Sequence, residues 1–154
     1  MSDWPGWTAL VVSVGTLARG EYLRAQGNAA ARRALVDDVL TTYEASDLFK
    51  PELPDFDARG LVDSANSWKE KCRVARQAVG RRSPLHGDLA VCISSATRFR
   101  NEVDKTILAR YPDRHTDQPV YVYGEDQDRL KALIGELVTA VSAPIHHMRD
   151  PRPR

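Results

Sequence analysis

Two consecutive stretches of this 154-residue sequence repeat one heptad spacing of apolar residues. Both sets step by four, three, four, three and four residues, which is the a/d pattern of a helix that buries one seam against a neighbour. This spacing predicts two helices, at about 58–80 and 84–111. The predicted seam residues are Leu61, Ala65, Trp68, Cys72, Ala75 and Val79 in the first helix and Leu85, Leu89, Cys92, Ala96, Phe99 and Val103 in the second.

A short connection, with the sequence GRRSP, joins the two predicted helices. Gly80 suits the left-handed conformation that often ends a helix, Ser83 can cap the next helix, and Pro84 suits a first helical turn. Because the connection is so short, we expect the two helices to be antiparallel neighbours.

Folding the hairpin about this connection predicts which seam residues face each other. Trp68 then lies opposite Ala96, and Ala65 lies opposite Phe99. A large side chain therefore meets a small one at both aromatic layers, and such matching fills a seam without voids.

Apolar periodicity predicts further helices near 8–26, 29–48 and 125–143, the last of them ended by Pro144. We therefore expect an all-α fold, a four- or five-helix bundle built on the hairpin. The predicted organisation is a single helical domain over residues 1–145, followed by a flexible basic tail over residues 146–154.

Composition restricts the functional classes. The net charge of +1 provides no global field toward nucleic acid or an anionic membrane. The uncharged stretch from Trp4 to Ala18 is shorter than the roughly 20 residues that a spanning helix needs, and no secretory signal is recognisable. We expect a cytoplasmic protein, and membrane association through residues 4–18 remains an open alternative.

Cys72 and Cys92 are the two cysteines of the chain, too few for a disulfide framework. Small buried thiols in the seam are the simplest interpretation, with a redox-sensitive disulfide as the alternative. No clustering of His, Cys and carboxylate residues predicts a metal site, and no cofactor is expected.

Charge is segregated along the chain. Residues 37–63 hold eight acids and two bases, whereas residues 69–82 hold six bases and one acid. The basic segment can contact phosphates, or it can be a solvated face that pairs with the acidic segment. The candidates for nucleic-acid binding are Lys69, Lys71, Arg73, Arg76, Arg81 and Arg82.

An arginine and a histidine separated by four residues occur twice, as Arg81 with His86 and as Arg110 with His115. This spacing resembles the active-site motif of HEPN-type ribonucleases, in which the two side chains flank a scissile phosphate. The resemblance implies a helical nuclease with these four residues as catalytic candidates. The sequence departs from the motif because Arg82 and Tyr111 stand where it has a polar residue, and because each match contains a proline.

No residue set predicts catalysis with any specificity. We expect a non-catalytic helical protein-interaction or assembly protein, with a protein partner or self-association. The excess of arginine over lysine, 17 against 5, indicates a GC-rich and bacterial coding sequence. The alternatives are a nucleic-acid-binding regulator that uses residues 69–82 and a HEPN-like ribonuclease.

Overall fold

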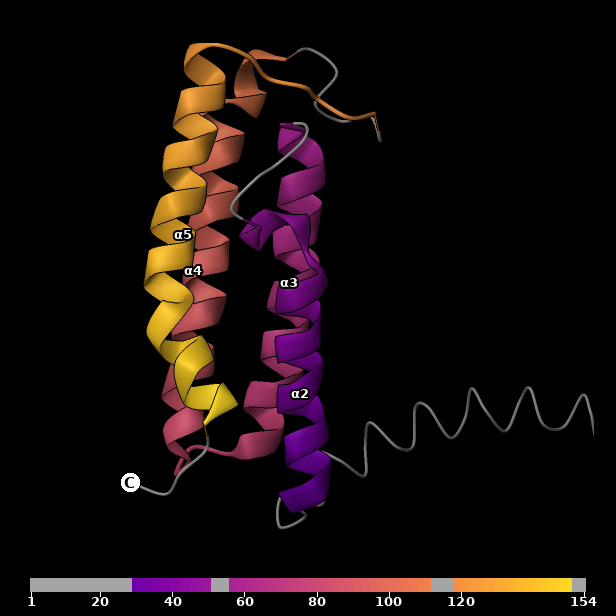
Figure 1. Ribbon diagram of the computed structural model, residues 1–154, viewed down its shortest axis with the longest axis vertical. Helices are drawn as coiled ribbons and strands as arrows, with labels where there is room; N and C mark the ends of the chain where they lie inside the picture. Colours follow the sequence, from indigo (N-terminus) through magenta and orange to yellow (C-terminus); the bar gives the residue numbers. More distant parts are fainter. Residues whose placement is uncertain (1–28, 51–55, 112–117, 151–154) are drawn as a thin grey trace, which may run out of the picture.

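The computed structural model describes residues 29–50, 56–111 and 118–150. Four α-helices pack against each other (Figure 1), as the predicted all-α bundle requires. The predicted helix at 8–26 lies outside the described residues. The helices are α2 (Ala29–Ala45), α3 (Ala58–Val79), α4 (Pro84–Thr106) and α5 (Glu125–Arg149), with short 3₁₀ helices η1 (Asp47–Phe49) and η2 (Leu108–Arg110).

Helices α3 and α4 form the antiparallel hairpin that the heptads predict, and they share the largest helix interface among the described residues. Gly80 ends α3 with a positive φ of 73°, and the Ser83 hydroxyl accepts a hydrogen bond from the Leu85 amide at 3.3 Å. The second helix was predicted to reach residue 111. It ends at Thr106 and is followed by η2.

The predicted seam is the core of the bundle. All twelve predicted positions are buried except Leu85, which is half-buried against the same core. Trp68 and Ala96, predicted to face each other, are 0% and 1% exposed. Burial of each large seam side chain contributes about 1.5–3 kcal/mol relative to exposure.

Helix α2 packs along α3 through an apolar stripe that includes Val36 and Val39, and both side chains are buried. The chain then turns through η1, which brings the Phe49 ring onto Trp68 with 4.9 Å between ring centroids. The Tyr43 ring stacks on Phe49 at 4.3 Å. This aromatic group joins α2 and η1 to the hairpin.

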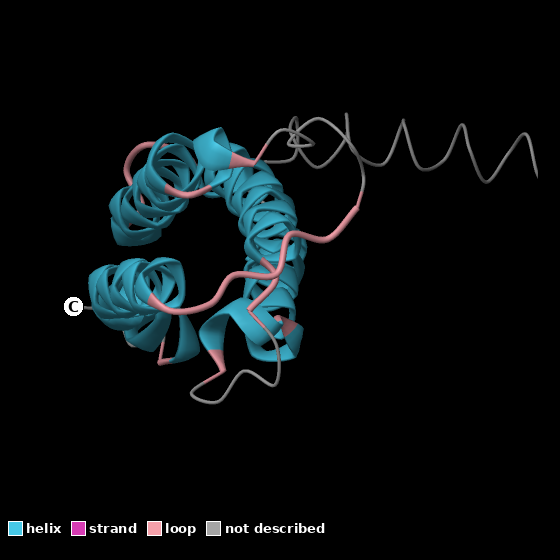
Figure 2. Ribbon diagram, turned by 90° about the horizontal axis from the view of Figure 1, so that it is seen from above, coloured by secondary structure: helices cyan, strands magenta, loops and turns pink. Residues whose placement is uncertain are grey.

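An extended segment crosses one end of the bundle before α5 begins (Figure 2). The Val122 amide donates to the Phe56 carbonyl at 3.0 Å, and the Ala58 amide donates to the Val120 carbonyl at 2.9 Å. The Asp57 carboxylate accepts from the Val120 amide at 2.9 Å. These bonds fasten the segment to the start of α3 and set where α5 enters the bundle.

Helix α5 does not end at Pro144, contrary to the prediction. It continues to Arg149, and Ile145 and Met148 beyond the proline are buried at 2% and 0% exposure. The main-chain carbonyl of Met148 accepts a hydrogen bond from Arg33 at 2.9 Å. These interactions offset the hydrogen bond that a proline removes from a helix interior.

The flexible tail predicted for residues 146–154 therefore does not begin at residue 146. Residues 146–149 are part of α5, and the Arg149 guanidinium contacts the Glu44 carboxylate of α2 at 3.1 Å. Residues 151–154 lie outside the described part of the chain.

Across residues 29–50, 56–111 and 118–150, no helix has both the length and the apolar character needed to cross a membrane. Residues 4–18, the candidate for membrane association, lie outside these ranges.

Candidate nucleic-acid interface

Three basic residues form a stripe on one flank of α3. Lys69, Arg73 and Arg76 are spaced by four and three residues, so they share one side of the helix over about 10 Å. Lys71 projects to the opposite flank, where its ammonium lies 2.9 Å from the Asp38 carboxylate of α2. The structure therefore separates Lys71 from the other candidates on this helix.

The basic stripe borders a hollow of about 450 Å³ between α3 and α4, which we name the flank hollow. Helix α4 contributes side chains spaced by seven and four residues, again one flank of a helix. The lining residues are Lys69, Arg73, Arg76, Gln77, His86, Ile93 and Thr97.

A second hollow, of about 900 Å³, lies at the connection between α3 and α4, and we name it the turn hollow. It shares Arg76, Gln77 and His86 with the flank hollow, so the two adjoin. No carboxylate of the described residues lines either one. The turn hollow is lined by Arg32, Arg76, Gln77, Val79, Gly80, Arg81, Arg82 and His86.

The ion pairs test the interpretation that the basic segment pairs with the acidic segment. Within the described residues, Lys71 makes such a pair with Asp38, and Arg73 pairs with Glu70 of its own helix at 3.1 Å. Both pairs are exposed and contribute little to stability. The other four candidates, Lys69, Arg76, Arg81 and Arg82, have no carboxylate partner in this part of the chain.

Two guanidinium groups of the turn hollow are short of acceptors. The Nε atoms of Arg32 and Arg76 are buried and make no hydrogen bond within the described residues. A buried charged donor without an acceptor is costly, so an anion bound nearby would be stabilised by both groups.

His86 lies between the two hollows and is affected by the same positive charge. Partial removal from water, followed by the charges of Arg76 and Arg81, lowers the pKa of His86 below its ordinary value. The imidazole is therefore mostly neutral at pH 7 and leaves the positive potential of the surface to the arginines.

The two Arg–His pairs that resemble the ribonuclease motif have different environments. Arg81 and His86 line the same turn hollow. His115 lies outside the described residues, so the second pair is not placed. The Arg110 side chain is held by the Asp126 carboxylate at 2.9 Å and by the Thr106 carbonyl at 2.6 Å.

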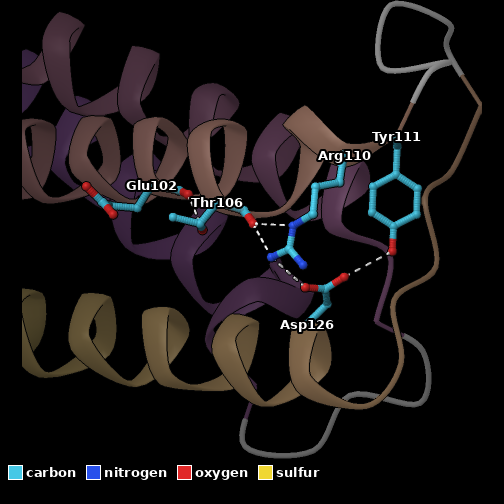
Figure 3. A network of polar contacts seen from close by, with 5 residues as sticks. All are labelled: Glu102, Thr106, Arg110, Tyr111 and Asp126. Carbon is cyan, nitrogen blue, oxygen red and sulfur yellow. Dashed lines mark hydrogen bonds and ion pairs between the residues drawn. The ribbon is translucent and has the colours of Figure 1, made fainter.

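Figure 3 shows that Arg110 belongs to a network between the end of α4 and the start of α5. The Tyr111 hydroxyl donates to the other Asp126 oxygen at 3.4 Å, and the Thr106 hydroxyl donates to the Glu102 carbonyl at 2.6 Å. Burial and the Asp126 carboxylate raise the pKa of Tyr111, which keeps its hydroxyl protonated as a donor. These contacts connect Arg110 to the end of α4 and the start of α5.

Cys72 and Cys92 are reduced and buried in the seam. A hydrogen bond between the two thiols, together with burial, raises the pKa of Cys72. The predicted level position of the two sulfurs is therefore confirmed, and both lie away from solvent. A raised pKa disfavours the thiolate that redox chemistry requires.

The two histidines of α5, His146 and His147, are not part of a metal-binding cluster among the described residues. His147 of α5 lies 3.0 Å from the Asp88 carboxylate of α4, and its neighbour His146 is exposed. No group of three or more His, Cys, Asp or Glu side chains in the described ranges is arranged to hold a metal ion.

Sequence reasoning missed Arg32. This residue belongs to α2, outside the basic segment, and it reaches the turn hollow because α2 runs antiparallel to α3. The signal was available, since an antiparallel neighbour brings the start of the helix predicted at 29–48 to the end of the helix predicted at 58–80.

Comparison of the chain with protein-family models, with curated proteins and with solved structures finds no match.

Proposed function

We propose that this protein is a non-catalytic helical protein that binds nucleic acid through the phosphate backbone. The observation that carries the proposal is the continuous basic surface of the flank and turn hollows, whose lining includes five guanidinium or ammonium groups without a carboxylate partner among the described residues. These groups belong to Arg32, Lys69, Arg76, Arg81 and Arg82.

Local charge supports this proposal better than total charge does. The net charge is only +1 because 21 acidic residues balance 22 basic ones, but no acidic residue of the described ranges lines the two hollows. A protein of this kind attracts a polyanion only at the basic surface. The bound nucleic acid therefore lies against that face. Contacts between Lys or Arg side chains and the phosphate backbone do not read the nucleotide sequence. We therefore expect the protein to show a weak preference among nucleotide sequences.

The shape of the surface favours an extended ligand. The basic stripe of α3 leads into the turn hollow through Arg76, which lines both hollows. A strand that follows this path meets successive cations. Neutralising each phosphate releases counterions, so the affinity should fall steeply with salt.

The test is fluorescence anisotropy with labelled duplex DNA and labelled single-stranded RNA, measured between about 50 and 200 mM salt. We expect binding with a slope of log affinity against log salt of about −0.9 per phosphate contacted for the duplex. The double variant Lys69→Gln/Arg73→Gln should bind more weakly, and its slope should be shallower by about 2.

A matched control removes the same charge from other faces. Lys71→Gln/Lys105→Gln also eliminates two cations, but Lys71 projects to the opposite flank of α3, Lys105 is exposed near the end of α4, and neither lines a hollow. If the two double variants lost equal affinity for nucleic acid, only the total charge of the protein would matter. Absence of salt-dependent binding to either nucleic acid would overturn the proposal.

A protein-interaction or assembly role is the second candidate. Its support is an apolar hollow of about 490 Å³ beside η1 and α5, where Phe49, Phe56 and Val138 are half-buried. The Lys131 ammonium lies 5.3 Å from the centre of the Phe56 ring. Light scattering that finds a stable oligomer, reduced to a monomer by Val138→Glu, would favour this candidate.

The ribonuclease alternative has its own test. It requires cleavage of RNA by the purified protein and loss of that cleavage in His86→Ala or His115→Ala. Binding without cleavage supports the non-catalytic proposal.

A further inference from the structure

We propose that the turn hollow is a site for a terminal phosphate monoester, such as the phosphorylated end of an oligonucleotide or a free mononucleotide. This inference rests on the proposed function, because it assigns the part of the ligand that enters the hollow. The basic stripe of α3 would contact backbone diesters, and the turn hollow would hold the end group.

Cations converge on the turn hollow from three parts of the chain. Arg32 comes from the first turn of α2, Arg76 from the last turn of α3, and Arg81 and Arg82 from the connection before α4. On the basic stripe, by contrast, the cations follow one helix and lie side by side. Four arginines from three parts of the chain around one hollow suit the compact, highly charged end group of a strand whose backbone lies along the basic stripe.

The charge of the ligand follows from this arrangement. A phosphate monoester carries about −1.5 to −2 at neutral pH, whereas a backbone diester carries one negative charge. It also presents three terminal oxygens, and arginine binds such oxygens through two parallel hydrogen bonds. Two of the lining arginines, Arg32 and Arg76, also have buried Nε atoms without a hydrogen-bond partner within the described residues, so negative charge near them would be stabilising.

The size of the hollow argues for more than a free inorganic ion. Its volume of about 900 Å³ is at the upper end of the range for small-molecule sites. The buried Val79 side chain supplies an apolar part of its wall, and Gln77 supplies neutral hydrogen-bonding groups. A nucleoside attached to the phosphate can therefore be accommodated.

The pKa of His86 can report whether a ligand occupies the turn hollow. The charged groups that line the hollow with it are Arg32, Arg76, Arg81 and Arg82, all of them positive. Asp88, two residues further along α4, is 3.0 Å from His147 of α5. A bound monoester would offset the arginine charges, so the pKa of His86 should rise on binding.

The experiment compares four ligands of the full chain by anisotropy or calorimetry. They are one oligonucleotide with a 5′-phosphate, the same strand with a 3′-phosphate, the same strand with hydroxyl groups at both ends, and adenosine monophosphate alone. We expect at least one phosphorylated strand to bind about tenfold more tightly than the hydroxyl strand.

Substitution then locates the preference. Arg32→Gln and Arg81→Gln should each weaken binding of the phosphorylated strand much more than binding of the hydroxyl strand, so that the preference for the phosphorylated end is lost. Arg33→Gln is the matched control, because this neighbouring arginine is bound to Asp37 and to the Met148 carbonyl. It should leave the preference intact.

The outcomes separate the two proposals. Equal affinity for phosphorylated and hydroxyl strands overturns the monoester site and leaves backbone binding standing. Binding of adenosine monophosphate with a rise in the pKa of His86, but without binding of any strand, supports the site and overturns the nucleic-acid proposal. If none of the four ligands binds, both are wrong.

Discussion

The indole N–H of Trp68 donates a hydrogen bond to the main-chain carbonyl of Val39, with 3.2 Å between nitrogen and oxygen. The bond connects the centre of α3 to the centre of α2, and it is buried. Trp68 thus belongs both to the hairpin seam and to the contact with α2 and η1.

Trp68→Ala should lower the free energy of unfolding by about 3–5 kcal/mol, because it empties a fully buried site beside Phe49 and Tyr43. Trp68→Phe keeps most of the apolar packing but leaves the Val39 carbonyl without its indole partner, so it should have a smaller effect. Urea unfolding measures both. A loss under about 1 kcal/mol for the alanine variant would contradict this position of the ring.

Met148→Ala should lower the free energy of unfolding by about 2–5 kcal/mol, because Met148 is fully buried beyond Pro144. Arg149→Ala should change it by less than about 1 kcal/mol, since the pair with Glu44 is exposed. Thermal or urea unfolding checks the contrast. Similar small effects from both substitutions would mean that the end of α5 does not contribute to the core.

The thiols of Cys72 and Cys92 should resist modification in the folded protein. Both are fully buried, and the raised pKa of Cys72 keeps it protonated at pH 8. With a chromogenic disulfide reagent, the two thiols should react slowly under native conditions. In denaturant, the same titration should detect both thiols. Mass spectrometry after mild oxidation should find both thiols free, and an intramolecular disulfide formed without unfolding would refute this expectation.

His86 should titrate below the ordinary histidine pKa of about 6.5. Since the folded state takes up this proton at a lower pH than the unfolded state, the contribution of His86 to stability falls as the pH drops through that range. Proton NMR of the imidazole gives the pKa directly. Arg81→Gln should raise it, whereas Arg33→Gln should not, because Arg81 but not Arg33 acts on this imidazole.

The heptad spacing predicted α3, α4 and their antiparallel packing because it records a contact between two neighbouring helices. It did not predict the ring partners of Trp68, which come from α2 and η1, because a seam pattern describes only one neighbour. The end of α5 was misjudged at Pro144 for a related reason. A proline is a local signal, and the burial of Met148 that outweighs it is a tertiary property.

The basic surface was only partly predictable. Its residues on α3 and in the connection were identified from charge alone, but their separation into the basic stripe and Lys71 depends on where α2 lies. Arg110 looked equivalent to Arg81 in the sequence. Their surroundings differ because Asp126, 16 residues further along the chain than Arg110, holds Arg110 in an ion pair.

The contact between α2 and α5 is small, and each described helix packs mainly on the next one in the chain. Such local topology is typical of domains that fold within microseconds to milliseconds. The Arg33–Met148 and Arg149–Glu44 contacts join residues 115 and 105 positions apart. They close long loops, so we expect them to form after the folding transition state, with φ-values near zero for substitutions there.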